Sequence, residues 1–71
     1  MEQKIIILGH TVSYDDNSRS GIYFLTHELD AQEQEVFFDQ AYSHGFAVFE
    51  DHMDKKYKLV HHGSEYQLVK S

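Results

Sequence analysis

Six histidines among 71 residues are the side chains in this sequence most able to do chemistry, because imidazole is the commonest metal ligand among protein side chains. His61 and His62 are adjacent, and successive side chains of a strand point to opposite faces, so this pair is poorly spaced to chelate one ion. The best remaining combination joins His44 to one of them, if a helix end and a hairpin turn meet at one sheet edge. We expect no metal and no cofactor, and retain these three histidines as a metal-binding alternative.

Other catalytic and metal-binding patterns are incomplete. "HELDA" begins like the zinc-protease motif H-E-x-x-H, but Ala31 stands in place of the second histidine. "DDNSRSG" has the polar character of a calcium loop, but Arg19 stands where an oxygen ligand is needed. Nothing around Ser43-His44 or Ser64 marks a strained nucleophile turn or an oxyanion hole. We therefore expect a protein without enzymatic activity.

An acidic run without any base extends from Glu28 to Asp39 and includes Asp30, Glu33 and Glu35. Acids are favoured near a helix N-terminus, so the simplest interpretation is a solvated helix face. The carboxylates of Glu28, Glu33, Glu35 and Asp39 would also suit a basic protein partner, whose approach they would accelerate. In the extreme they would mimic nucleic acid and occupy the site of a DNA- or RNA-binding protein.

The net charge of −6 is divided unevenly: residues 1–54 carry 11 acids against Lys4 and Arg19, and residues 55–71 carry four lysines against Glu65. Phosphate binding depends on Lys and Arg, so we expect no direct nucleic-acid partner. No apolar run is long enough for a membrane span or a signal-peptide core, and without cysteine there is no disulfide or cysteine-bound zinc. These features predict a cytoplasmic protein with no membrane partner, and its small size favours a bacterial or phage origin.

The elements that would position these residues follow from hydrophobic periodicity. "KIIILGHTV" predicts a buried strand over 4–12, and "GIYFLTHEL" predicts a second over 21–27, antiparallel to the first across the polar loop "SYDDNSRSG". A helix follows, with Asp30 and Glu33 as a capping box and Gly45 as the residue that ends it. Its core-facing stripe contains residues at three- and four-residue spacings: Gln34, Phe37, Phe38, Ala41 and His44.

Three short strands then form a meander, over the ranges 46–52, 56–62 and 64–70. The last hairpin can turn at 62–63 or at 63–64. Turns at 54–55 and 62–63 place charge opposite charge and apolar opposite apolar, in the pairs Asp51–Lys58, Leu59–Tyr66 and Tyr57–Leu68. One face of the sheet then collects six apolar residues: Phe46, Val48, Tyr57, Leu59, Tyr66 and Leu68.

The predicted fold is a small single α+β domain over 1–71, with a mostly antiparallel sheet, one helix packed on one face, and the order ββαβββ. This order of a hairpin, a helix and further strands resembles that of the β-grasp architecture. The likeness is one of topology and implies no function.

The two N-terminal strands are apolar on both faces, and one helix can cover only one of them. The outer face would expose Ile6, Leu8, Tyr23 and Leu25 unless other parts of the chain fold over it, and exposed apolar patches commonly mark interfaces. We therefore expect a small, cytoplasmic, non-catalytic protein-interaction module, which binds a protein partner or forms a homodimer through this apolar face or the acidic helix. An acidic, nucleic-acid-mimicking inhibitor and a histidine-based metal-binding protein are the alternatives.

Overall fold

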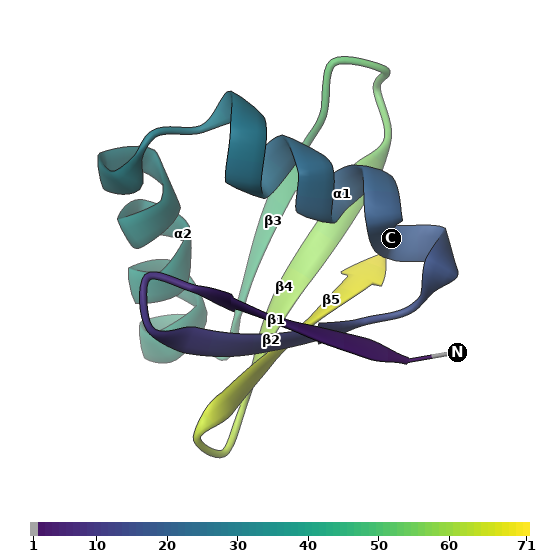
Figure 1. Cartoon of the computed structure of the whole chain (residues 1–71). Coiled ribbons are helices and arrows are strands. Elements are labelled where there is room, and N and C mark those ends of the chain that lie inside the picture. The colour runs from purple at the N-terminus through teal and green to yellow at the C-terminus, as the bar shows by residue number, and fades with distance from the viewer. Residues whose placement is uncertain (1) are drawn as a thin grey trace.

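The chain forms one five-stranded sheet and two helical segments in the computed structural model, which describes residues 2–71. Figure 1 shows their arrangement. The strands are β1 (Gln3–Ile7), β2 (His10–Tyr14), β3 (Phe46–Glu50), β4 (Lys56–His62) and β5 (Glu65–Lys70). The first helical segment consists of the 3₁₀ turn η1 (Asp16–Ser18), α1 (Arg19–Tyr23) and the π-helical turn η2 (Phe24–Glu28), and the second is α2 (Ala31–His44).

The strands lie in the order β1-β2-β5-β4-β3. Neighbours are antiparallel except β2 and β5, which run parallel, with Val12 opposite Tyr66 and Tyr14 opposite Leu68. This parallel contact joins the N-terminal hairpin to the C-terminal meander. The predicted class, a small α+β domain with a mostly antiparallel sheet, is confirmed.

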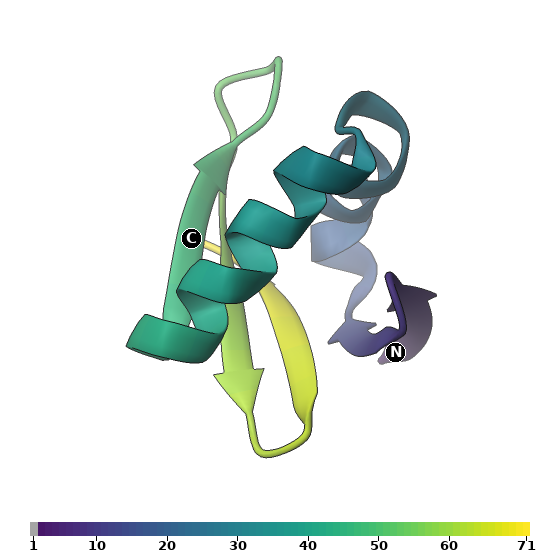
Figure 2. The same ribbon diagram turned by 90° about the vertical axis from the view of Figure 1, so that its left-hand side faces the viewer.

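Both helical segments pack against the same face of the sheet. Figures 1 and 2 show α2 lying across β3 and β4. The other helix, α1, passes over the start of β4 and the end of β5. The core that they enclose with the sheet consists of Ile7, Val12, Ile22, Leu25, Phe38, Ala41, Ala47, Phe49, Tyr57, Leu59, Tyr66 and Leu68. No described helix covers the opposite face of the sheet, where Phe46 and Val48 are about half-exposed.

The predicted strand over 4–12 is wrong, because this segment is a hairpin that turns at Leu8-Gly9. Both residues have positive φ, 52° and 80°, and Ile7 pairs with His10 across the turn. Two positive φ values are the pattern of a type I′ turn, whose twist matches that of the adjoining strands. Leucine is an unusual residue in this conformation, so the continuous apolar run concealed the turn.

The predicted strand over 21–27 is also wrong, because this segment is helical and forms α1 and η2. Ile22 and Leu25 are both buried in the core, whereas a strand would turn residues three apart to opposite faces. Thr26 Oγ1 donates a hydrogen bond to the carbonyl of Ile22 at 2.8 Å, and Gln34 Nε2 donates one to the carbonyl of Leu25 at 2.7 Å. A side chain of α2 thus satisfies a carbonyl within η2. The polar loop predicted before this segment contains η1 and the start of α1.

Helix α2 begins and ends as predicted. Asp30 Oδ1 accepts a hydrogen bond from the backbone N–H of Glu33 at 2.9 Å, and Glu33 Oε1 accepts one from the backbone N–H of Asp30 at 3.2 Å. Gly45 ends the helix with φ 92°. The predicted stripe is largely confirmed: Gln34, Phe38 and Ala41 are buried and Phe37 is partly buried, while His44 is exposed.

The meander forms, but its registers differ from the prediction. The last hairpin turns at Gly63-Ser64, so Leu59 lies opposite Leu68 and not opposite Tyr66. This shift moves the partner by two residues, and an even shift keeps the same side chains on the core face. Tyr57, Leu59, Tyr66 and Leu68 are therefore buried together, as predicted.

Between β3 and β4 the shift is odd, and it inverts β3. Val48, and not Asp51, lies opposite Lys58, because residues 51–55 form a longer loop in which Asp51 Oδ1 accepts hydrogen bonds from the backbone N–H groups of Met53 and Lys55. An odd shift turns every side chain of a strand to the other face. The core face of β3 therefore presents Ala47 and Phe49, and not the predicted Phe46 and Val48.

None of the helices in the described part of the chain has the length and apolar character that crossing a membrane requires.

Candidate functional site

A groove lies between the first half of α2 and the outer edge of β3, and we call it the α2–β3 groove. Its volume is about 370 Å³, which is within the range of ligand-binding clefts. In Figure 2, α2 and β3 diverge from the turn that joins them. Six apolar residues and two glutamates line it: Phe24, Leu29, Val36, Phe37, Val48 and Phe49, with Glu33 and Glu50.

Three aromatic side chains from three elements pack together in this groove. The ring centroid of Phe49 in β3 lies 5.3 Å from that of Phe37 in α2 and 5.8 Å from that of Phe24 in η2. Val36 and Val48 remain 53% and 48% exposed. The groove therefore combines a packed aromatic base with apolar side chains that are still accessible to a ligand.

The backbone of β3 presents unpaired polar groups beside the groove. The carbonyl of Gly45 accepts a hydrogen bond from the N–H of His61 at 2.9 Å, and the N–H of Asp51 donates to the carbonyl of Lys55 at 3.0 Å. In an antiparallel ladder, alternate residues bond to the same neighbour, so the odd-numbered residues of β3 face β4. The backbone N–H and C=O groups of Phe46, Val48 and Glu50 consequently point outward, at what we call the free edge of β3.

The groove is electrostatically negative. Glu33 and Glu50 line it from α2 and β3, and within residues 2–71 neither forms an ion pair with a basic side chain. Glu33 also accepts the capping hydrogen bond of Asp30, which fixes its position at the first turn of α2. Lys56 is the cross-strand neighbour of Glu50 on β4, but no ion pair joins these two described residues, so a positively charged ligand could reach both carboxylates without breaking one.

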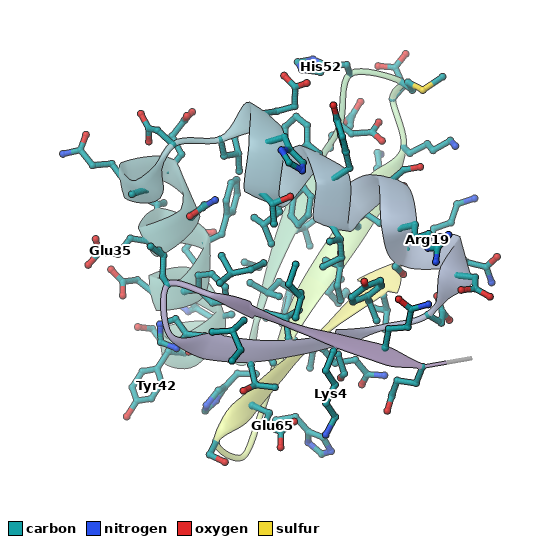
Figure 3. The ribbon with its side chains drawn as sticks, in the orientation of Figure 1. Lys4, Arg19, Glu35, Tyr42, His52 and Glu65 are labelled. Atoms are coloured by element: carbon teal, nitrogen blue, oxygen red, sulfur yellow. The ribbon has the colours of Figure 1, made fainter. Side chains whose placement is uncertain are left out.

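The four predicted acidic residues are all exposed, but they do not share one site. Glu33 lines the groove, whereas Glu28 contacts His52 at 3.1 Å. Figure 3 shows Glu35 projecting from α2 away from the rest of the molecule. Asp39, one turn further along α2, is also exposed. The sequence did not identify Glu50 as a site residue, because only the tertiary fold places β3 beside α2.

The predicted apolar sheet face, Ile6, Leu8, Tyr23 and Leu25, does not exist as one surface. Leu25 is fully buried in the core, and Tyr23 belongs to α1, where its ring packs on His27 with centroids 4.5 Å apart. Ile6 and Leu8 are exposed, one on β1 and the other in the following turn. The prediction failed because it assumed that residues 21–27 form a strand beside residues 4–12.

The histidines that formed the metal-binding alternative are separated by their surroundings. The ring of His61 lies 5.1 Å from those of Tyr42 and Tyr66, while His62 lines a polar hollow with Lys4 and Glu65. Figure 3 shows Lys4 and Glu65 approaching each other at this hollow, with 3.5 Å between Nζ and Oε1. Within residues 2–71, no group of three or more histidine, cysteine, aspartate or glutamate side chains could hold a metal ion.

Tyr66 is the titratable residue whose environment is most clearly altered. It is buried between the rings of His10, Phe38 and His61, at centroid distances of 5.1, 4.9 and 5.1 Å. Burial raises the pKa of Tyr66 above its ordinary value of 10.0, and the negative charges of ionised Tyr42 and of Asp39 raise it further. The phenol therefore remains neutral at physiological pH and belongs to the core.

Comparison with known proteins gives no relative from which a function could be transferred: no family model, no curated protein and no solved structure matches this chain. The resemblance of the element order to the β-grasp architecture stays a prediction.

Proposed function

We propose that this chain is a small cytoplasmic, non-catalytic protein-interaction module and that it binds its protein partner in the α2–β3 groove. The observation that carries the proposal is the meeting of three features at one place: accessible apolar side chains, unpaired strand backbone and two unpaired carboxylates. Protein interfaces commonly combine an apolar centre with a polar rim. The sequence supports the cytoplasmic setting only in that it has no cysteine to oxidise.

The groove differs from the other surfaces of the molecule in combining these features. The face of the sheet without a helix has half-exposed Phe46, but Lys58 already lies over its ring, with Nζ 5.1 Å from the centroid. The hollow near Lys4 and Glu65 is lined almost entirely by polar side chains. Neither surface offers an apolar depression beside a free strand edge.

Selection from a random peptide library, displayed on phage and followed by nuclear magnetic resonance mapping, tests the proposal. Selected peptides should shift the amide resonances of Val36, Val48 and Glu50, and a Val36→Glu variant should reduce their binding at least about tenfold. The matched control is Gln40→Glu, which adds the same charge at an exposed position of α2 that does not line the groove. Peptides whose shifts map to another surface, or that bind both variants equally, contradict the proposal.

A further inference from the structure

We infer that the occupant of the α2–β3 groove is an extended peptide segment of a partner protein, which adds to the free edge of β3 as a sixth strand and carries both apolar and basic residues. This inference rests on the proposed function, since it assumes that the groove is the docking site. It goes further by stating the conformation and the charge of the segment that binds there.

The extended conformation follows from the backbone of β3. Phe46, Val48 and Glu50 direct their N–H and C=O groups outward, and these groups repeat at the spacing that an added strand matches. Addition of a strand to an exposed sheet edge is a recurrent mode of peptide recognition, in which the backbone supplies affinity and pockets for alternate side chains supply specificity.

The apolar character follows from where alternate side chains of the added strand would point. On the helix side they would continue the row of Ala47 and Phe49 and enter the groove against Val36 and Phe37. A groove of about 370 Å³ has room for such side chains. Branched aliphatic residues suit it, because they are favoured in strands and would bury against the exposed Val36.

The basic character follows from the two carboxylates. Glu50 points to the other face of the sheet, so a residue opposite it on the added strand would lie beside its carboxylate. Glu33 lies on the helix side of the groove. Lysine or arginine on the face of the segment away from α2 would pair with Glu50, whereas an acidic segment would be repelled by both carboxylates.

The second free edge of the sheet is less suited to the same role. On β1, the residues that point away from β2 are Lys4 and Ile6, because Ile7 pairs with His10 across a two-residue turn. A lysine on an edge strand discourages pairing with another chain, and Lys4 is also engaged with Glu65. The free edge of β3 carries no lysine.

A second copy of this chain would fit the groove poorly. Pairing of β3 with β3 of another molecule would bring two sets of Glu33 and Glu50 together, with no base in either groove to balance them. The second copy could not fill the groove either, because its own Ala47 and Phe49 are buried in its core. We therefore assign the groove to a partner of opposite charge.

The first experiment measures fluorescence anisotropy of a labelled peptide that alternates isoleucine and lysine, in three forms: unmodified, N-methylated on the lysines, and N-methylated on the isoleucines. Only one set of N–H groups can face β3, so one methylated peptide should lose about tenfold or more in affinity while the other binds nearly as well as the parent. If methylation of the lysine N–H groups weakens binding, the peptide adds antiparallel to β3. If methylation of the isoleucine N–H groups weakens binding, it adds parallel to β3. Equal binding, or equal loss, by the two methylated peptides overturns strand addition.

The second experiment tests charge recognition with matched protein variants. Glu33→Gln combined with Glu50→Gln neutralises the groove, and glutamine at position 33 can still accept the capping hydrogen bond. Glu35→Gln combined with Asp39→Asn makes the same change of net charge at exposed positions of α2 that do not line the groove. The first pair should weaken binding of the lysine peptide several-fold more than the second. Equal weakening overturns recognition of the lysines by the carboxylates of the groove.

A third peptide separates failure of this inference from failure of the proposed function. It has the same isoleucine and lysine content, arranged at helical spacing, and its binding is mapped by amide shifts. If it occupies the groove more tightly than the alternating peptide, the groove is a docking site but strand addition is wrong. If neither peptide nor any library peptide shifts the groove resonances, both the inference and the proposed function are wrong.

Discussion

Leu8 occupies the first central position of the β1–β2 turn with φ 52°. A left-handed backbone costs a residue with a side chain roughly 1–2 kcal/mol, and asparagine tolerates it better. We expect Leu8→Asn to raise the free energy of unfolding by about 1 kcal/mol, measured by urea denaturation. Ile6→Asn is the control, because Ile6 is 71% exposed and lies in regular strand. If both substitutions change stability equally, backbone strain at Leu8 is not the cause.

Tyr57 has a fully buried side chain whose hydroxyl has no hydrogen-bond partner among the described residues. Burial of an unpaired hydroxyl is unfavourable, so Tyr57→Phe should increase the free energy of unfolding by about 1 kcal/mol. Tyr14→Phe is the matched control, because the Tyr14 hydroxyl donates a hydrogen bond to Gln3 Oε1 at 3.2 Å, and its loss should be neutral or destabilising. A clear loss of stability in the Tyr57 variant would contradict the expectation.

Tyr66 should make the fold sensitive to alkaline pH. Because burial raises its pKa in the folded state above 10.0, the folded chain retains a proton that the unfolded chain releases. The stabilisation is therefore complete below about pH 10 and is lost as the pH rises through the folded-state pKa. Urea midpoints measured across this range should fall less steeply for Tyr66→Phe than for the natural chain. Parallel curves would show that Tyr66 does not contribute.

At the scale of elements, α1 approaches the sheet closely at Gly21. A Cβ added to Gly21 would lie 2.8 Å from the Tyr57 ring, which is itself fully buried. Helix propensity alone would favour alanine by about 1 kcal/mol, but overpacking costs about 1–3 kcal/mol. We expect Gly21→Ala to destabilise the chain, while Ser20→Ala, at an exposed neighbouring position of α1, should be neutral or stabilising. Thermal unfolding of the two variants decides between sterics and propensity.

The elements differ in how far local sequence determines them. Helix α2 is predictable because the Asp30–Glu33 capping box and Gly45 act within the helix itself. In contrast, "GIYFLTHEL" suits either structure: its aromatic and branched residues favour a strand, while Ile22 and Leu25 are also spaced for one side of a helix. The helix packs on Tyr57, which is distant in sequence, and accepts the hydrogen bond from Gln34 in the following helix, so contacts outside the segment accompany its helical state.

At the scale of the whole molecule, the chain is compact and its charge opposes self-association. The radius of gyration, 10.7 Å, is close to the ~11 Å expected for a compact domain of this length. A net charge of −6 and unpaired glutamates in the groove oppose self-association through β3. We therefore expect sedimentation equilibrium at neutral pH to show a monomer at micromolar concentrations. A dimer that Glu50→Lys abolishes would instead identify the groove as a self-association surface.

The sequence by itself determined the fold class, the limits of α2 and which residues of β4 and β5 face the core, because caps, periodicity and alternation act between near neighbours. Tertiary structure decided the helical state of residues 19–28, the parallel contact of β2 with β5 and the inversion of β3. It also decided the site: Glu33 and Glu50 are distant in the chain and line one groove only because β3 folds back along α2. Such arrangements depend on loop length and on packing between distant segments, which local patterns do not encode.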